Sequence, residues 1–418
     1  MDRIHDVIVV GGGPAGAQLA IRLARAGRDV VVLDRMRFPR AKPCGEFLGP
    51  ECIPILDELG LVEPVLAAGA RAIRSMTLVG HGRRTNGRFG TIGRSAAQAP
   101  EGRALSREAL DELTLREAER SGADVREGWS VGGLLRDASG AVTGVRATDP
   151  GGESRELRAR FTVGADGIRS RVARELGTFS RVDWLDRMAL SVRVEDAPVH
   201  DRAEVHFVPG GYFAIAPIEG GRSTLNLVLD RAEFGGGRSV LRERIEDRLE
   251  HAPELRAWLP PIADDAEILA IGPLACRTRS ARSSTAPHSW ATRAGQVDPL
   301  TGEGLYIAMR GAALLAESLA SALAAGRTDA GALAPYARAR KREFAHRRAL
   351  ALALQRGLRH PSVVGGVLAV LAARPRITDL LMGMTGTSVP PRELLRPSVW
   401  YDLLRRPSAA ASTGGARG

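Results

Sequence analysis

The N-terminal stretch "VIVVGGGPAGAQLAIRLARAGRDVVVLD", residues 7–34, limits the fold more than any other part of the chain. The apolar run Val7–Val10 predicts a buried strand, and the residues after the glycines repeat their apolar positions with the period of a helix. A second apolar run then ends on Asp34. A strand, a helix and a strand in this order predict a βαβ unit and therefore a parallel sheet.

Three glycines in the first turn, Gly11, Gly13 and Gly16, have the spacing G-x-G-x-x-G. In a βαβ unit the first permits the tight turn, the second lets the backbone approach a pyrophosphate, and the third lets the helix pack on the strand. The N-terminus of the helix then faces the phosphates, and Asp34 is placed for ribose hydroxyls. The unit therefore predicts a dinucleotide site, and these residues alone leave FAD and NAD both open.

The net charge of +11 first suggests a nucleic-acid partner, but the distribution of the charge argues against one. Arginines are scattered along the chain and interleaved with acids, as in "RERIEDRLE" (242–250), and aromatic residues are sparse. We therefore expect a solvated arginine-rich surface and no nucleic acid. The 418 residues leave room for one large unit or two intergrown domains with a substantial core.

The three cysteines, Cys44, Cys52 and Cys276, are odd in number and lack metal-ligand spacing. They predict neither a disulfide framework nor a metal site, and they favour a reducing compartment, with the cytoplasm as the expected location. The apolar stretch "VVGGVLAVLAA" (363–373) is too short to cross a bilayer but could lie against one as a peripheral contact. The sequence does not indicate the oligomeric state.

Four further segments carry a resemblance to a known family. They read "FPRAKPCGEFLGP" (38–50), "ALSREALDELTLREAERSGADV" (104–125), "VGADGIRSRVAREL" (163–176) and "VDPLTGEGLYIAM" (297–309). In this order and spacing they resemble the geranylgeranyl reductase-like flavoproteins, which belong to the superfamily of FAD-dependent aromatic hydroxylases. With the glycine turn, the resemblance covers residues 1 to about 325 and is specific in combination.

The resemblance implies non-covalent FAD, with NAD(P)H or a protein as the electron donor. It places the cofactor at Gly11, Gly13, Ala15, Gly16, Asp34, Arg35, Gly45, Arg107, Val125, Asp166, Gly167, Pro299, Gly302, Gly304 and Leu305. Gly45 and Val125 would contribute through their backbones. Arg107 taken alone would more often be a charge at the surface start of a helix. A helix that begins at Gly304 would turn its positive end toward the flavin.

The expected fold class is α/β, with a Rossmann-like FAD-binding domain built on a parallel sheet and an interleaved substrate domain built on an antiparallel sheet. A helical C-terminal region follows. The expected boundaries are 1–70, 100–180 and 270–325 for the FAD-binding domain, 71–99 and 181–269 for the substrate domain, 326–407 for the C-terminal helices, and 408–418 for a disordered tail.

Alternating residues and glycine turns in the stretch 202–230 predict three successive strands of the substrate domain. Tyr212 and Phe213 on these strands are candidates for the wall of a pocket, although an aromatic residue on such a strand is more often part of the core. His206 is expected on the solvent face. A hydrophobic small molecule is the expected substrate.

The resemblance implies reduction of carbon–carbon double bonds in a prenyl or other hydrophobic substrate. Hydroxylation of an aromatic or polyketide-type metabolite is the alternative, because both reactions occur on this fold. Reduction of an alkene needs a proton, and Cys44 or Glu46 could supply it. Both residues could instead shape their loop, with Cys44 as a packing residue and Glu46 as a cap for nearby backbone amides.

One segment departs from the family pattern. The resembling proteins carry Gly-Asp-Ala-Ala-Gly before the "DPLTGEG" loop, and the aspartate that would bind FAD falls at Thr292. Residues 277–293 have four arginines, no acid and none of the apolar alternation of a strand. GC-rich codons chosen for 282–295, read from the third base, give "VVDGAALMGDA" with the motif, and removal of one G restores "AGQVDPLTGEG". We interpret 277–293 as translated in a shifted frame; an inactive or impaired flavoprotein is the further alternative.

Overall fold

The computed structural model describes residues 3–90, 99–198, 200–234, 239–274, 276–278, 289–291, 299–329 and 331–385, together with Pro397 and Tyr401. The predicted tail 408–418, most of the predicted helical region after residue 385, and Thr292 lie outside these residues.

The first sheet is the predicted parallel sheet with an antiparallel extension. Its strands are β1 (Ile4–Val10), β2 (Val30–Asp34), β8 (Asp124–Glu127), β9 (Ser130–Arg136), β10 (Val142–Thr148), β11 (Ser154–Gly164) and β19 (Ser289–Ala291), in the order β8-β2-β1-β11-β10-β9 with β19 beside β11. The pairs β2–β8, β1–β2, β1–β11 and β11–β19 are parallel, whereas β10 pairs antiparallel with β11 and β9. The βαβ unit predicted from residues 7–34 is confirmed.

The turn between β1 and α1 (Pro14–Arg25) requires two of its glycines. Gly11 has a φ of 106°, and a Cβ there would lie 2.5 Å from the carbonyl oxygen of Ala165. A Cβ on Gly16 would lie 1.9 Å from the carbonyl oxygen of Gly11. The turn therefore closes tightly on the end of β11 and brings the N-terminus of α1 to the carboxyl edge of the sheet.

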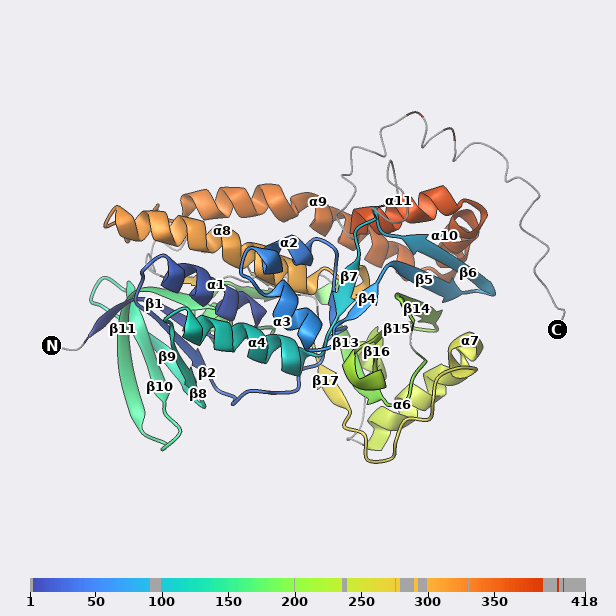
Figure 1. Ribbon diagram of the computed structural model, residues 1–418, viewed down its shortest axis with the longest axis horizontal. Helices are drawn as coiled ribbons and strands as arrows, with labels where there is room; N and C mark the ends of the chain where they lie inside the picture. Colours follow the sequence, from blue (N-terminus) through green and yellow to red (C-terminus); the bar gives the residue numbers. More distant parts are fainter. Residues whose placement is uncertain are drawn as a thin grey trace.

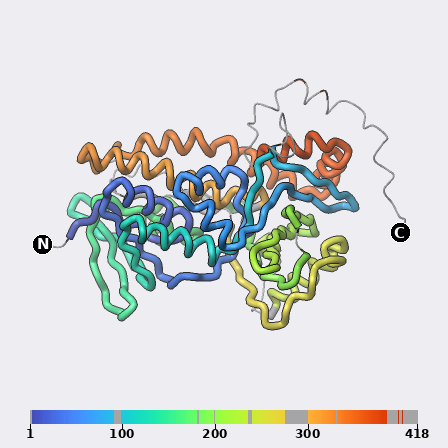
Figure 2. Tube along the Cα trace, in the orientation of Figure 1, coloured from blue at the N-terminus to red at the C-terminus, as the bar shows by residue number. Residues whose placement is uncertain are grey.

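The second sheet is mainly antiparallel. Its strands are β5 (Ser75–Gly80), β6 (Arg83–Arg88), β13 (Arg187–Val194), β14 (Arg202–Val208), β15 (Gly211–Pro217), β16 (Ser223–Asp230) and β17 (Leu269–Ile271), in the order β17-β13-β16-β15-β14-β5-β6. Among the strand pairs of this sheet in the described residues, only that of β14 with β5 is parallel. The three strands predicted for 202–230 are β14, β15 and β16. The chain crosses between the two sheets several times, so neither sheet is continuous in sequence (Figure 2).

The remaining elements connect or cover the two sheets. The short strands are β3 (Phe47–Leu48), β4 (Arg71–Ile73) and β7 (Gly102–Ala104), which form one small sheet, and β12 (Phe179–Arg181) with β18 (Cys276–Thr278). The other helices are α2 (Cys52–Asp57), α3 (Val62–Ala67), α4 (Arg107–Arg120), α5 (Arg171–Glu175), α6 (Ser239–Glu250), α7 (Pro253–Arg256), α8 (Gly304–Ala324), α9 (Ala334–Leu358), α10 (Pro361–Ala373) and α11 (Pro375–Thr385). The 3-10 turns are Asp183–Leu185, Glu219–Gly221, Arg231–Phe234 and Pro299–Thr301.

Two groups of helices lie over the sheets (Figure 1). Helix α1 packs between α4 and α8, and α9 lies on α8. At the other end of the molecule α10 and α11 lie against β5 and β6. Of the described helices, α8 is long and apolar enough to span a membrane by composition, but it is part of the core that it forms with α1. The α/β fold class with a helical C-terminal region is confirmed.

The placement predicted for His206 is wrong. Its side chain is 1% exposed, and its Nε2 lies 2.8 Å from Glu204 Oε2, which is also buried. The alternation of residues along β14 correctly placed His206 on the face opposite to Val205 and Phe207. The prediction that this face meets solvent was the error. Helices α6 and α7 cover this side of the second sheet, and the hydrophobic cluster between them includes Val208 on the same strand.

A short strand precedes the "DPLTGEG" loop. Residues Ser289–Ala291 form β19, whose backbone pairs in parallel with Thr162–Gly164 of β11. Backbone pairing along β11 does not require apolar alternation, so the unusual composition of 277–293 did not reveal the strand.

Candidate functional site

A cavity of about 250 Å³ lies between the carboxyl edge of the first sheet and the second sheet. Its lining includes ten of the residues predicted for the site: Gly13, Ala15, Cys44, Gly45, Glu46, Arg107, Gly167, Gly302, Gly304 and Leu305. They come from the glycine turn, the loop after β2, the start of α4, the loop after β11 and the start of α8. The fold therefore brings together segments that are up to about 290 residues apart in the chain.

Two guanidinium groups overhang the glycine turn. A Cβ on Gly13 would lie 3.6 Å from Arg40 Nη2 and 3.8 Å from Arg107 Nη2, so the glycine leaves an open approach beneath both cations. The N-terminus of α1, with its unpaired backbone amides, begins at the next residue. Positive side chains, a helix N-terminus and a residue without a side chain together make a site for an anionic group.

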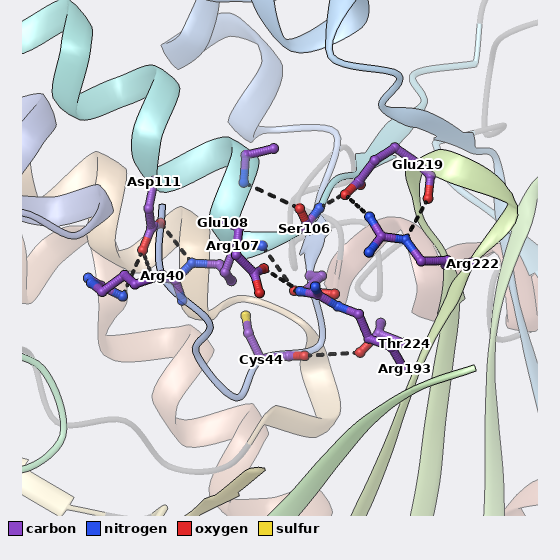
Figure 3. Close-up of polar contacts among 12 residues, drawn as sticks. Arg40, Cys44, Ser106, Arg107, Glu108, Asp111, Arg193, Glu219, Arg222 and Thr224 are labelled. Atoms are coloured by element: carbon purple, nitrogen blue, oxygen red, sulfur yellow. Dashed lines mark hydrogen bonds and ion pairs between the residues drawn. The ribbon is translucent and has the colours of Figure 1, made fainter. Parts of the chain in front are cut away.

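A buried carboxylate holds these cations in place (Figure 3). Asp111 accepts two hydrogen bonds from Arg107, Nε to Oδ1 at 2.8 Å and Nη2 to Oδ2 at 2.7 Å. Arg40 Nη1 lies 3.3 Å from Asp111 Oδ2, and its Nη2 lies 3.8 Å from Asp34 Oδ2. The bidentate geometry fixes the Arg107 guanidinium rather than leaving it to sample rotamers.

Lys42 adds a third cation to this side of the cavity. Burial, and then the charge of Arg107, lower the pKa of Lys42 to about 8. The protonated form of Lys42 is therefore destabilised in this cavity, and a bound anion beside it would stabilise that form. Arg40, Lys42 and Arg107 with Asp34 and Asp111 leave a net positive charge beside the helix N-terminus. The residues present fit the diphosphate of a dinucleotide.

Asp34 lies at the end of β2 as predicted, but its carboxylate is engaged by the backbone. Its Oδ2 accepts from the amide of Gly12 at 2.8 Å, and its Oδ1 accepts from the amide of Met36 at 2.9 Å. Val125 lies on the neighbouring strand β8, opposite Val32 of β2. Asp34 and Val125 thus lie on adjacent strands, so both could border a nucleoside at this edge of the sheet.

The remaining predicted cofactor residues do not line the cavity. Gly11 and Gly16 form the closed turn described above, and the side chain of Arg35 is exposed. Asp166 caps α5, with its Oδ1 accepting from Ser170 Oγ at 2.5 Å and its Oδ2 accepting from the Arg171 amide at 2.6 Å. The backbone of Pro299 begins the 3-10 turn before α8.

Glu46 is buried with one oxygen paired and one free. Its Oε1 accepts from the Arg107 amide at 2.9 Å and from Arg193 Nη2 at 2.8 Å. Within the described part of the chain Oε2 has no hydrogen-bond partner. Burial raises the pKa of the Glu46 carboxyl, against the opposing effect of Arg193. Its φ of 53° is a left-handed conformation that costs a non-glycine residue about 1 kcal/mol or more.

The N-terminus of α4 joins the two sheets around Glu46. The amide of Ser106 donates to Glu219 Oε2 at 2.9 Å, just before the Arg107 amide that donates to Glu46. Arg193, from β13 of the second sheet, binds Glu46. It also binds Glu108 (Figure 3). Amides of the first turn of α4 and one arginine thus set the position of the Glu46 side chain.

Cys44 lies two residues before Glu46 and is half-buried at the cavity wall. Its thiol neighbours the Arg107 guanidinium. Its carbonyl oxygen accepts from Thr224 Oγ1 of β16 at 3.5 Å, so the loop after β2 is attached to the second sheet (Figure 3). The loop therefore connects the cation cluster with the strands that face it.

The second sheet supplies an apolar wall. Its contribution to the lining is Ala189, Tyr212, Ala214, Asn226, Val228 and Ile271, and Leu274 follows β17. Tyr212 lines the cavity, whereas Phe213 is fully buried in the cluster on the opposite face of the sheet. Of the two aromatic candidates, only Tyr212 reaches the cavity, because neighbouring residues of a strand point to opposite faces.

The start of α8 closes the cavity. Gly302 has a φ of 68°, and a Cβ there would lie 2.9 Å from the ring of Phe47. Glu303 at the N-cap position is buried and accepts from Arg347 Nη1 of α9 at 2.6 Å. Arg347 also stacks on the ring of Tyr306, 4.2 Å from its centroid. Two helices therefore fix the turn whose glycines face the cavity.

Sequence reasoning missed Arg40, Asp111 and Arg193. Arg40 lies inside the "FPRAKPCGE" segment, and Asp111 follows Arg107 by four residues on a helix, a spacing that predicts an ion pair. Both could have been found. Arg193 lies 147 residues from Glu46 in the chain, and no local pattern links the two.

Comparisons with known proteins agree with this geometry. Residues 5–264 match the family described as FAD binding domain. A digeranylgeranylglycerophospholipid reductase 2 of Methanothermobacter thermautotrophicus is 27% identical over 378 residues, covering 87% of this chain and 88% of that protein. A ubiquinone hydroxylase of Rhodospirillum rubrum is 30% identical over 344 residues, covering 79% of this chain and 76% of that protein.

A solved structure has the same overall fold. It is a geranylgeranyl bacteriochlorophyll reductase-like protein of Thermoplasma acidophilum, with a TM-score of 0.71 and 18% identity over 97% of this chain and 100% of that chain. At this identity the likeness concerns the fold alone.

Proposed function

Because the chain belongs to the FAD binding domain family and is an FAD-dependent oxidoreductase, we propose that it reduces carbon–carbon double bonds of a prenyl or other hydrophobic substrate. The observation that carries this proposal is the Glu46 carboxyl. It is buried, has a raised pKa and a free oxygen, and lies in a cavity whose opposite wall is apolar.

Saturation of a double bond adds a hydride and a proton. FAD, when bound and reduced, supplies the hydride. A carboxyl whose pKa is raised by burial is protonated at a higher pH than an exposed one, and this suits a general acid. Oε1 of Glu46 accepts from Arg193 and the Arg107 amide, so Oε2, which has no partner within the described residues, is the oxygen that would carry the proton.

The proposed cofactor contacts follow the geometry of the cavity. Gly13, Arg40 and Arg107 hold the diphosphate, and Lys42 adds charge beside it. Ala15, Gly45, Gly167, Gly302, Gly304 and Leu305 border the ring system, while Asp34 and Val125 border the nucleoside. Asp166 acts by holding the loop after β11 in place. The division into domains at the predicted boundaries and a location in the cytoplasm remain part of the proposal.

Substitutions at the loop test the proton donor. Glu46→Gln should keep bound FAD and normal flavin reduction but lose product formation, since the amide cannot donate an acidic proton. Cys44→Ala tests the other candidate for the proton donor by the same three measurements. Glu108→Gln is the matched control, because Glu108 shares Arg193 with Glu46 but does not line the cavity. Turnover of Glu46→Gln at the parent rate would show that Glu46 is not the donor.

Hydroxylation is the second candidate, favoured by the 30% identity to a ubiquinone hydroxylase. Both reactions consume electrons from NAD(P)H or a protein donor, but only hydroxylation requires oxygen. NAD(P)H consumption with and without oxygen, in the presence of an alkene or an aromatic substrate, therefore separates them.

An impaired flavoprotein remains the third candidate because of Thr292 and the unusual composition of 277–293. Resequencing the DNA across these codons tests the frame directly. If threonine is genuine, loss of a charge-assisted hydrogen bond should weaken FAD binding by about 1.5–3 kcal/mol.

A further inference from the structure

Helix α10 lies at the end of the molecule that carries the second sheet (Figure 1). It exposes an apolar face there. Val363, Val367 and Val370 are 45%, 46% and 38% exposed, and their spacing puts them on one side of the helix. We call these three side chains the valine ridge. The adjacent side of the helix, with Leu368 and Leu371, is buried against the sheet. Ordinary surface helices place polar residues where α10 has the ridge.

The charged residues that flank α10 in the chain are arginines. Arg356 and Arg359 precede α10, and Arg374 and Arg376 follow it. The sequence has no acidic residue between Glu343 and Asp379. Three of these four arginines are exposed, and Arg356 and Arg359 pack on the ring of Trp184 at 5.1 and 5.7 Å. Arginines at both ends of an apolar helix complement negative headgroups on either side of a hydrocarbon surface.

An apolar chamber of about 290 Å³ lies under the ridge. Val363 and Val367 form part of its wall, with Leu78, Phe207, Leu354 and Leu300. Leu300 and Thr301 line this chamber, and Gly302 lines the cofactor cavity, so one turn of chain separates the two spaces. Tyr212 of the cofactor cavity also contacts Phe207 of the chamber, with ring centroids 6.5 Å apart. The chamber therefore connects the ridge with the wall of the cofactor cavity.

We propose that α10 docks on a bilayer that contains anionic lipid, with the valine ridge in the headgroup region and the chamber beneath it holding a hydrocarbon chain of the substrate. A helix of 13 residues is too short to cross the bilayer and lies in its surface. A second copy of the chain fits less well, because twofold pairing of this face brings its arginines together. The identity of the chain in the chamber rests on the proposed function, but the docking does not.

Co-sedimentation of the full-length holoprotein with vesicles tests the docking. The parent should bind vesicles of phosphatidylcholine and phosphatidylglycerol, and added salt should weaken the binding. Val367→Asp with Val370→Asp should weaken it about tenfold or more, since two charges would enter the apolar layer. Arg359→Gln should weaken it roughly fivefold and only on anionic vesicles. Leu66→Asp is the matched control, because Leu66 is a similarly exposed apolar residue on α3.

Three outcomes would overturn the docking. The first is a parent protein that binds these vesicles no better than the double aspartate variant. The second is a dimer that Val370→Asp dissociates, with no vesicle binding, which would make the face an interface between copies. The third is loss of thermal stability in Val370→Asp without vesicle binding, which would mean that the chain itself covers the ridge.

The chamber is tested separately. Ala353→Phe adds bulk at the chamber wall and should lower turnover of a long-chain alkene several-fold while turnover of a short alkene is unchanged. Equal turnover of the long chain in the variant and the parent would overturn the role of the chamber. Vesicle binding without alkene reduction of any length would instead leave the docking intact and contradict the proposed function.

Discussion

At the residue scale, the cation cluster beside the glycine turn determines how FAD binding should depend on pH. Lys42 has a pKa of about 8 in the protein without an anion, because burial and Arg107 disfavour its charge. A diphosphate beside it would raise this pKa. Binding therefore takes up a proton when the pH is above about 8, and affinity falls as the pH rises.

We expect the dissociation constant of FAD to be constant below pH 8 and to rise by up to about tenfold per pH unit above it. Lys42→Met should bind FAD more weakly at pH 7 and lose this dependence. Titration of the apoprotein with FAD, followed by flavin fluorescence, measures both. A pH profile shared by the parent and Lys42→Met would contradict the position of Lys42 next to the diphosphate.

The ionised Glu204 carboxylate contributes to the free energy of unfolding, and this contribution is lost at low pH. Burial would raise the pKa of Glu204, but hydrogen bonds with His206 and Arg202 outweigh burial and lower the pKa to about 2. The folded state thus binds this proton less readily than the unfolded state. The stabilisation is fully present above the unfolded value of 4.5 and disappears as the pH falls toward 2.

Glu204→Gln should therefore lower the free energy of unfolding at pH 7 by about 3 kcal/mol and by progressively less below pH 4.5. Denaturant unfolding at a series of pH values measures the difference. Glu254→Gln is the control, since Glu254 is an exposed neighbour of Arg84 in the same charge cluster. A constant difference between parent and Glu204→Gln from pH 7 to 2 would be inconsistent with this pKa.

At the scale of elements, α9 fixes the start of α8. Arg347 is 7% exposed and pairs with Glu303 at the N-cap position and with Glu51 at 3.6 Å. Arg347→Met would leave the buried carboxylate of Glu303 and the half-buried carboxylate of Glu51 without this cation. Removing one partner of a buried ion pair typically costs about 3–5 kcal/mol. Because Gly302 and Gly304 line the cavity on either side of Glu303, FAD binding should also weaken.

Thermal unfolding and FAD titration of Arg347→Met test this coupling. Arg342→Met, an exposed position on the same helix, should change neither quantity appreciably. If Arg347→Met lost stability but bound FAD like the parent, the pair would hold α8 and α9 together without positioning the cavity loop.

Elements with a strong local signal could be predicted from the sequence. The βαβ unit follows from the apolar period and the glycines, and the strands β14 to β16 follow from alternation between glycine turns. The sequence of β14 could not indicate that His206 is buried. The helices that cover its face, α6 and α7, are separate segments, and no pattern within the strand shows that they pack there. Strand β19 could not be predicted from its own three residues, because it is defined by backbone pairing with Thr162–Gly164 of β11.

The same distinction holds for the candidate site. Cys44, Glu46 and Arg107 were found as members of short segments, and the structure places all three at one cavity. Their partners come from elsewhere. Arg193 belongs to the second sheet, and its contact with Glu46 forms only when the two sheets pack. Local sequence patterns cannot report such contacts between distant segments.

At the scale of the whole molecule, two sheets contribute different chemistry to one cavity. The first sheet with α1, α4 and α8 supplies glycines, cations and helix N-termini, whereas the second supplies an apolar wall. The chain crosses between them several times, and the loop after β2 contacts both. A bound cofactor would therefore stabilise both sheets together, because its contacts come from segments throughout the chain.

Anaerobic turnover of an alkene tests the central claim most directly. Holoprotein reduced with dithionite is mixed with a prenyl lipid under argon, and the product mass and the flavin absorbance are followed together. We predict that the flavin is reoxidised in the absence of oxygen and that the lipid gains two hydrogen atoms, with the rate strongly reduced in Glu46→Gln. A flavin that stays reduced until oxygen is admitted, with a product that then carries a new oxygen atom, would contradict reduction and identify the protein as a hydroxylase.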